Sequence, residues 1–170
     1  FLTHIGQQSY AGIAKKIIFD GGAPSEVLLF GTGNLANDIA KLLRRKTKIT
    51  ICARNEEKTW AVAQKEKSIE TLAWDQRKNW TEHKVIINTI GAQTDFYDQN
   101  HFEQWKKNHQ YKEEKGLFID LSYPSMLNTH YTVEEGVIRL KEVFEKGSEL
   151  DKEKQEKIFN ARTEILKLSK

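Results

Sequence analysis

Residues 27 to 36 read Val-Leu-Leu-Phe-Gly-Thr-Gly-Asn-Leu-Ala, an apolar run that ends in the spacing Gly-x-Gly-x-x-Ala. In a strand–turn–helix unit this spacing is typical of dinucleotide binding. Gly31 allows the tight turn, Gly33 lets backbone approach a pyrophosphate, and Ala36 lets the helix pack on the strand. The N–H groups at the helix start then face the phosphates. The candidate phosphate-binding residues are Gly31, Thr32, Gly33, Asn34, Leu35 and Ala36. The alternative is an ordinary turn without a ligand.

The end of the next apolar run indicates which dinucleotide is bound. Units that bind NAD place Asp or Glu here, on the ribose 2′-OH. This chain instead has Arg54, whose guanidinium offers two donors to a 2′-phosphate, and a lysine follows one helical turn later. Four residues are assigned to this part of the site: Ala53, Arg54, Asn55 and Lys58. The pattern predicts NADPH as the cofactor, and the alternative is a surface arginine paired with Glu56 or Glu57.

Two further strand ends supply candidate residues. The apolar run from Lys84 to Asn88 is followed by Thr89, Ile90 and Gly91, which we assign to the nicotinamide half of the site. A simple turn is the alternative there. The next run ends at Asp120, which either holds a loop by accepting N–H bonds or touches the cofactor. The structural role is the preferred interpretation.

The remaining reactive residue types indicate neither catalysis nor metal binding by this chain. The five histidines are scattered, and no pair has a metal-ligand spacing supported by Cys or carboxylate neighbours. Cys52, the only cysteine, lies in an apolar strand pattern and is interpreted as a small core residue. We therefore assign no catalytic residue and no metal ligand.

Apolar runs and amphipathic segments alternate along the chain. Strands are expected at 26–30, 48–53, 69–72, 84–88 and 116–121, and helices at 10–19, 34–45, 56–66, 75–81 and 101–108, with Asp75 as a cap. This alternation predicts an α/β fold, a Rossmann-like doubly wound parallel sheet with flanking helices.

The character of the chain changes after Pro124. Residues 132–170 are rich in Lys and Glu with apolar residues at helical spacing, and Gly147 marks an expected break. Two amphipathic helices on the sheet are one interpretation. A helical arm that continues into another domain is the favoured one, because 151–157 is too polar to be wholly packed. The expected divisions are a leading helix (1–22), an NADP(H)-binding domain (23–131) and a C-terminal helical segment (132–170).

Composition places further limits on function. The 170 residues are 30% charged, with net charge +3 and no basic stripe of the kind that binds nucleic acid. Mean hydropathy is −0.65, and no stretch approaches the roughly 20 apolar residues of a membrane helix. The start has neither an initiator Met nor a signal-peptide pattern, which suggests a piece of a longer protein. A single cysteine fits a reducing, cytoplasmic setting.

Four segments together resemble the NADPH-binding domain of glutamyl-tRNA reductase. Residues 9–17 resemble the family's helix before the nucleotide fold, and 31–36 stand where the family has Gly-x-Gly-x-Met-Gly. Residues 49–55 resemble its strand ending in Asn-Arg-Thr, whose Arg meets the 2′-phosphate. Residues 118–124 resemble its Ile-Asp-Leu-Ala-Val-Pro-Arg. The resemblance covers most of 9–128.

The sequence departs from the family pattern at four positions, as a divergent member would. They are Ala53, Asn55, Ile90 and Ser125, where the family has Asn, Thr, Thr and Arg. The family's nucleophilic Cys belongs to an N-terminal domain that is not in this chain.

The resemblance implies a reaction in two parts. In the full-length protein, a Cys thiolate would take glutamate from glutamyl-tRNA as a thioester. Hydride from NADPH would then reduce it to glutamate-1-semialdehyde, in tetrapyrrole (heme) biosynthesis. This chain would supply cofactor binding only and would be inactive alone. The implied partners are NADPH and, through other domains, glutamyl-tRNA, in a protein that could be a homodimer and has no membrane contact.

Two alternatives stay open. An NADP-dependent shikimate- or siroheme-pathway dehydrogenase would use the same cofactor domain, and shikimate dehydrogenases need a Lys/Asp pair from a preceding domain. A nucleotide-sensing module without chemistry would commonly read NAD(H) through an acid after the second strand. Arg54 in that place argues against it.

Overall fold

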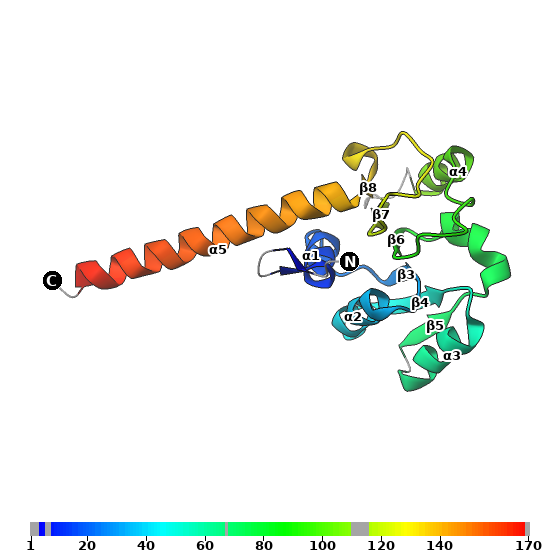
Figure 1. Ribbon diagram of the computed structural model, residues 1–170, viewed down its shortest axis with the longest axis horizontal. Helices are drawn as coiled ribbons and strands as arrows, with labels where there is room; N and C mark the ends of the chain where they lie inside the picture. Colours follow the sequence, from blue (N-terminus) through cyan, green and yellow to red (C-terminus); the bar gives the residue numbers. More distant parts are fainter. Residues whose placement is uncertain (1–3, 6–7, 67, 110–115, 169–170) are drawn as a thin grey trace.

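A six-stranded parallel sheet forms the centre of the molecule (Figure 1). The computed structural model describes residues 4–5, 8–66, 68–109 and 116–168, so residues 1–3, 6–7 and 169–170 of the expected end segments lie outside it. The strands are β3 (Glu26–Phe30), β4 (Lys48–Cys52), β5 (Ile69–Thr71), β6 (Val85–Asn88), β7 (Leu117–Asp120) and β8 (Val137–Ile138). Their order is β5-β4-β3-β6-β7-β8. The chain therefore reverses its winding direction between β3 and β6, where ligands bind in such sheets.

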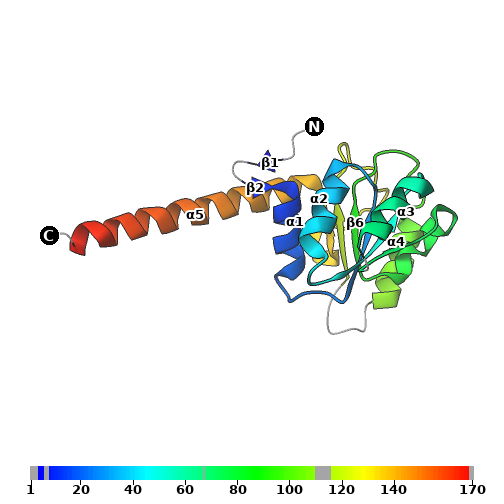
Figure 2. The same cartoon turned by 90° about the horizontal axis from the view of Figure 1, so that it is seen from below.

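Helices cover both faces of this sheet, as Figure 2 shows. One face carries α1 (Tyr10–Phe19), α2 (Asn34–Leu43), α3 (Glu56–Lys65) and the first turns of α5 (Leu140–Leu168). The other carries the 3₁₀ helix η1 (Trp74–Glu82) and α4 (Gln99–His109). Two short strands, β1 (His4–Ile5) and β2 (Gln8–Ser9), pair antiparallel before α1, and η2 (Val133–Glu135) precedes β8.

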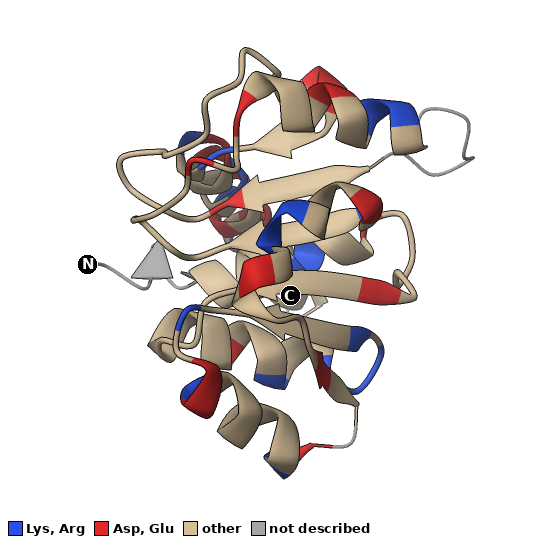
Figure 3. Cartoon of the chain, turned by 90° about the vertical axis from the view of Figure 1, so that its right-hand side faces the viewer, with Lys and Arg blue, Asp and Glu red and all other residues tan. Residues whose placement is uncertain are grey.

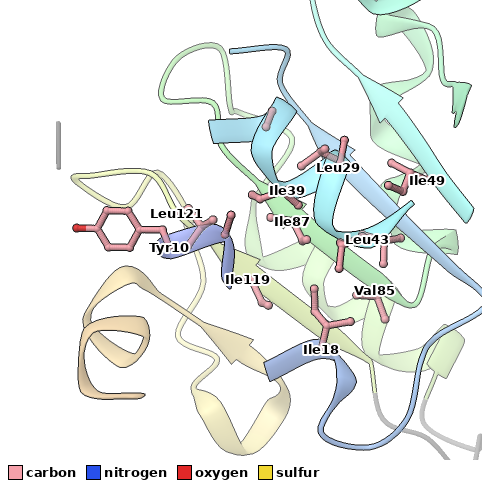
Figure 4. Close-up of a cluster of buried hydrophobic side chains, with 14 of the residues drawn as sticks. Tyr10, Ile18, Leu29, Ile39, Leu43, Ile49, Val85, Ile87, Ile119 and Leu121 are labelled. Atoms are coloured by element: carbon pink, nitrogen blue, oxygen red, sulfur yellow. The ribbon is translucent and has the colours of Figure 1, made fainter. Parts of the chain in front are cut away.

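The side chains of each strand contribute alternately to two separate hydrophobic cores, because successive side chains point to opposite faces of the sheet. On the first face Leu29, Ile49 and Ile87 pack against α1 and α2 (Figure 4). On the second face Phe30 and Phe118 pack among the aromatic rings of η1, α4 and the loop between β6 and α4. Both faces of β3, β6 and β7 are thus buried, which explains why these strands read as largely apolar runs, whereas two of the three residues of β5 are exposed.

The fold class predicted from the sequence is confirmed, with local corrections. Asp75 does not cap a helix, because the 3₁₀ helix begins one residue earlier with Ala73 at its cap. The expected break at Gly147 is wrong: α5 runs unbroken through this buried glycine. Residues 133–138, expected within the helical segment, instead form η2 and β8, and β8 extends the sheet beside β7.

The helix α5 projects far from the sheet as an arm (Figures 1 and 2). Its first turns are anchored, since Leu140 and Val143 are buried and the Phe144 ring meets Tyr10 edge-on, with centroids 5.6 Å apart. From Lys152 onward nearly every residue is exposed. Among the described residues, none of the helices combines the length and the apolarity needed to cross a bilayer.

Candidate functional site

A cleft lies at the carboxyl ends of β3, β6 and β7. Its volume is about 340 Å³. The residues that line it are Gly31, Thr32, Gly33, Asn34, Leu35, Ala36, Thr89, Ile90, Gly91, Leu121, Ser122 and Tyr123. The structure therefore brings together two groups of residues that the sequence assigned to the site separately, those of the Gly-rich turn and those after β6. The third group, from the loop after β7, was not among the assigned residues.

Gly31 and Thr89 join the two halves of the sheet at this cleft. Gly31 has φ +121°, a conformation that favours glycine, and its N–H donates to the Cys52 carbonyl at 3.0 Å. A Cβ at Gly31 would lie 2.1 Å from Thr89 Oγ1. That hydroxyl in turn donates to the Phe30 carbonyl at 2.7 Å. The first glycine is therefore needed for both its backbone conformation and the close approach of Thr89.

The amino end of α2 faces the cleft with free donors. Gly33 is the N-cap, no side chain caps the helix, and the first turn contains no acidic residue. Among the described residues, the first helical N–H with a backbone partner is that of Asn37, which donates to the Gly33 carbonyl. The N–H groups before it are open to an anion, and the helix dipole favours negative charge there. A Cβ built on Gly33 meets nothing within 4 Å, so this glycine leaves open space on the cleft side. Both features fit a coenzyme pyrophosphate.

The residues assigned to the 2′-phosphate lie beside this cleft, not in its lining. Arg54, Asn55 and Lys58 are exposed between β4 and the first turn of α3, where the Asn55 side chain accepts the Lys58 N–H at 3.0 Å. Within the described residues Arg54 has no ion-pair partner, so the predicted alternative of a pair with Glu56 or Glu57 is not formed. Its guanidinium is therefore available to a ligand.

A second, smaller pocket adjoins Arg54. It is lined by Ala53, Glu56, Thr59, Trp60, Thr71, Leu72 and Ala73. Of the four residues assigned to the 2′-phosphate, only Ala53 lines this pocket, and it is buried directly after β4. Trp60, which lines this pocket, is 62% exposed, an unusual setting for an indole.

The cysteine thiol of this chain is buried in the core. Cys52 is completely buried, and desolvation raises the pKa of its thiol to about 12, although nearby Arg77 favours the thiolate. The thiol stays neutral and unreactive at ordinary pH. Among the described residues, no three His, Cys, Asp or Glu side chains cluster as a metal site would require. Along the helices, Lys and Arg are interspersed with Asp and Glu (Figure 3).

Most of the chain matches one known protein family. Residues 13–143 match the family described as shikimate/quinate 5-dehydrogenase. The chain belongs to the shikimate/quinate 5-dehydrogenase family. Members of this family are NAD(P)-dependent dehydrogenases, so the cleft belongs to an NAD(P)-binding domain. No curated protein sequence matches the chain.

The fold of the chain is similar to that of solved glutamyl-tRNA reductases and shikimate dehydrogenases. The nucleotide-binding domain of glutamyl-tRNA reductase from Thermoplasma volcanium is 25% identical, with a TM-score of 0.67, over 89% of this chain and 99% of that domain. Glutamyl-tRNA reductase from Methanopyrus kandleri (14% identity, TM-score 0.63) matches over 94% of this chain but only 41% of its own length. Shikimate dehydrogenase from Aquifex aeolicus (17%, 0.55) matches over 81% and 52%. The last two show the fold alone, and the chain spans about half of each.

Proposed function

We propose that this chain is the NADPH-binding domain of a glutamyl-tRNA reductase. The observation that carries the proposal is the match to the Thermoplasma domain, which extends over 99% of that domain at 25% identity. The sequence motifs at 31–36, 49–55 and 118–124, which resemble those of the same enzyme, agree with it. The thioester-forming Cys would lie on another domain, because Cys52 is buried and neutral.

The residues of the chain would divide the binding of the coenzyme among them. The open N–H groups of α2 would hold the pyrophosphate, with Gly33 leaving room for its approach. Arg54 would pair with the 2′-phosphate, and Lys58 would add positive charge. The loops that follow β6 and β7 would orient the nicotinamide. Bound NADPH would supply the hydride that reduces the glutamyl thioester.

Replacing Arg54 with alanine tests the choice of coenzyme. A hydrogen bond to a charged group contributes about 1.5–3 kcal/mol, so NADPH should bind about 10- to 100-fold more weakly. The affinity for NADH should not change, because NADH lacks the phosphate. Reduced-nicotinamide fluorescence during titration gives both constants. Arg162→Ala, on the exposed part of α5, is the matched control. An Arg54→Ala chain with wild-type affinity for NADPH would contradict the assignment.

A reconstitution experiment tests the reaction. The chain alone, with NADPH and glutamyl-tRNA, should oxidise no NADPH, whereas a longer form with the thioester-forming domain should produce glutamate-1-semialdehyde. Turnover by the chain alone would contradict the division of labour. The family match favours a second candidate, a shikimate or quinate dehydrogenase. A longer form that reduces NADP⁺ with shikimate or quinate, and leaves glutamyl-tRNA unchanged, would establish that candidate instead.

A further inference from the structure

A buried carboxylate lies at the carboxyl end of β7, next to the cleft. Asp120 Oδ1 accepts hydrogen bonds from Asn88 Nδ2 (2.9 Å), Ser122 N (3.0 Å) and Ser122 Oγ (2.7 Å). Its Oδ2 accepts one from Ser125 Oγ (2.6 Å). Asp120 is completely buried, and no cation of the described chain pairs with it. A carboxyl group buried without a cation is stabilised by the hydrogen bonds that it accepts, and here every donor is a neutral amide or hydroxyl group.

The donors come from the end of β6 and from the loop after β7, which border the same side of the cleft. Asn88 is the last residue of β6 and pairs in register with Asp120. Its Nδ2 also donates to the Ile90 carbonyl at 2.9 Å, and its Oδ1 accepts the Tyr97 hydroxyl at 2.9 Å. Ile90 and Ser122 both line the cleft. One carboxylate therefore fixes the positions of the loop after β6 and the loop after β7 relative to each other.

The two halves of the sheet divide a dinucleotide between them. In folds of this strand order each half binds one mononucleotide, and the residue after the second strand contacts the adenosine ribose. Here that residue is Arg54, after β4. The half formed by β6, β7 and β8, which contains Asp120, therefore faces the nicotinamide mononucleotide.

We propose that Asp120 is a positioning residue for the nicotinamide half of the coenzyme. It acts through Asn88, Ser122 and Ser125, which hold the two loops at the width that the nicotinamide requires. This inference rests on the proposed function of the chain as a dinucleotide-binding domain. It goes further by naming residues outside the Gly-rich turn that decide how the reactive end of the coenzyme is held.

Ser125→Ala tests the role with little risk to folding. Ser125 is exposed and does not line the cleft, and among the described residues its hydroxyl is the only partner of Asp120 Oδ2. Its loss should weaken NADPH binding by up to about tenfold, because one hydrogen bond to a charged group is equivalent to about that factor. Binding of 2′,5′-ADP, which lacks the nicotinamide half, should not change. Ser125→Thr keeps the hydroxyl and should keep the affinity for NADPH. Ser148→Ala, on an exposed position of α5, is the matched control.

The ratio of the two affinities separates positioning from a general structural role. Equal weakening of NADPH and 2′,5′-ADP, or no weakening of either, would overturn the proposal. If the wild-type chain prefers NADH, the proposed NADPH specificity fails, and the same ratio measured with NADH and ADP-ribose decides the role of Asp120. A wild-type chain that binds no dinucleotide would overturn both the inference and the function on which it rests.

Discussion

Replacing Gly31 with alanine is expected to lower the free energy of unfolding by about 2–5 kcal/mol and to abolish coenzyme binding. Backbone strain at φ +121° and overpacking against Thr89 Oγ1, 2.1 Å from the new Cβ, contribute comparable amounts. The melting temperature should fall by roughly 4–20 °C for a chain of this size. Calorimetry and NADPH titration measure the two effects.

Two further variants separate the effect on stability from the effect on coenzyme binding, and test whether Thr89 causes the overpacking. Gly33→Ala has an ordinary φ of −73° and open space around its Cβ, so it should melt like the wild type and still lose coenzyme affinity. Adding Thr89→Ala to Gly31→Ala removes the contacting oxygen. The double variant should therefore be more stable than the sum of the single effects predicts. Strict additivity of the two changes would show that Thr89 does not cause the overpacking.

The second large effect is expected at Trp80. This indole is completely buried in η1, donates Nε1–H to the Phe96 carbonyl at 2.9 Å, and lies 4.8 Å from the Phe102 ring centroid. Trp80→Ala should lower the free energy of unfolding by about 3–5 kcal/mol, since it opens a cavity and leaves a buried carbonyl without its donor. Urea denaturation, followed by far-UV circular dichroism, gives the value.

Variants at the same and at a different tryptophan separate packing from the hydrogen bond. Trp80→Phe keeps a ring but loses the N–H, so its cost should be smaller, about 1–3 kcal/mol. Trp60→Ala, at a largely exposed tryptophan, should change stability by no more than about 0.5 kcal/mol. Equal losses from Trp80→Ala and Trp60→Ala would contradict the assignment of Trp80 to the core.

Most of the strands and their order along the chain could be predicted because they are short, largely apolar and followed by a distinct turn. Glu26–Phe30 and Val85–Asn88 are buried on both faces, and a strand buried in this way shows in the sequence as a run of apolar residues. The pair Val137–Ile138 left no such trace. Two residues are too few for a periodic pattern, and the helical spacing of the residues that follow concealed them.

The candidate site could likewise be predicted only in part. The Gly-rich turn is a local feature, so its position in the cleft could be predicted from spacing alone. The network around Asp120 joins residues up to 32 positions apart, and only the register of β6 and β7 brings Asn88 to it. The available signal was a polar residue at the end of each of two buried strands. Gly147 is a case in which a local feature gave a wrong prediction. A glycine weakens a helix, but this one is buried against neighbouring residues, and α5 continues through it.

The arm formed by α5 governs how the molecule diffuses. Twenty-nine helical residues extend about 44 Å, whereas a compact chain of 170 residues has a radius of gyration of about 15 Å. Friction with solvent grows with the longest dimension, so a single copy migrates through a gel-filtration column ahead of spherical standards of 19.7 kDa. Elution volume would therefore assign too large a mass to a monomer, whereas light scattering or sedimentation equilibrium, which do not depend on shape, would return the true one.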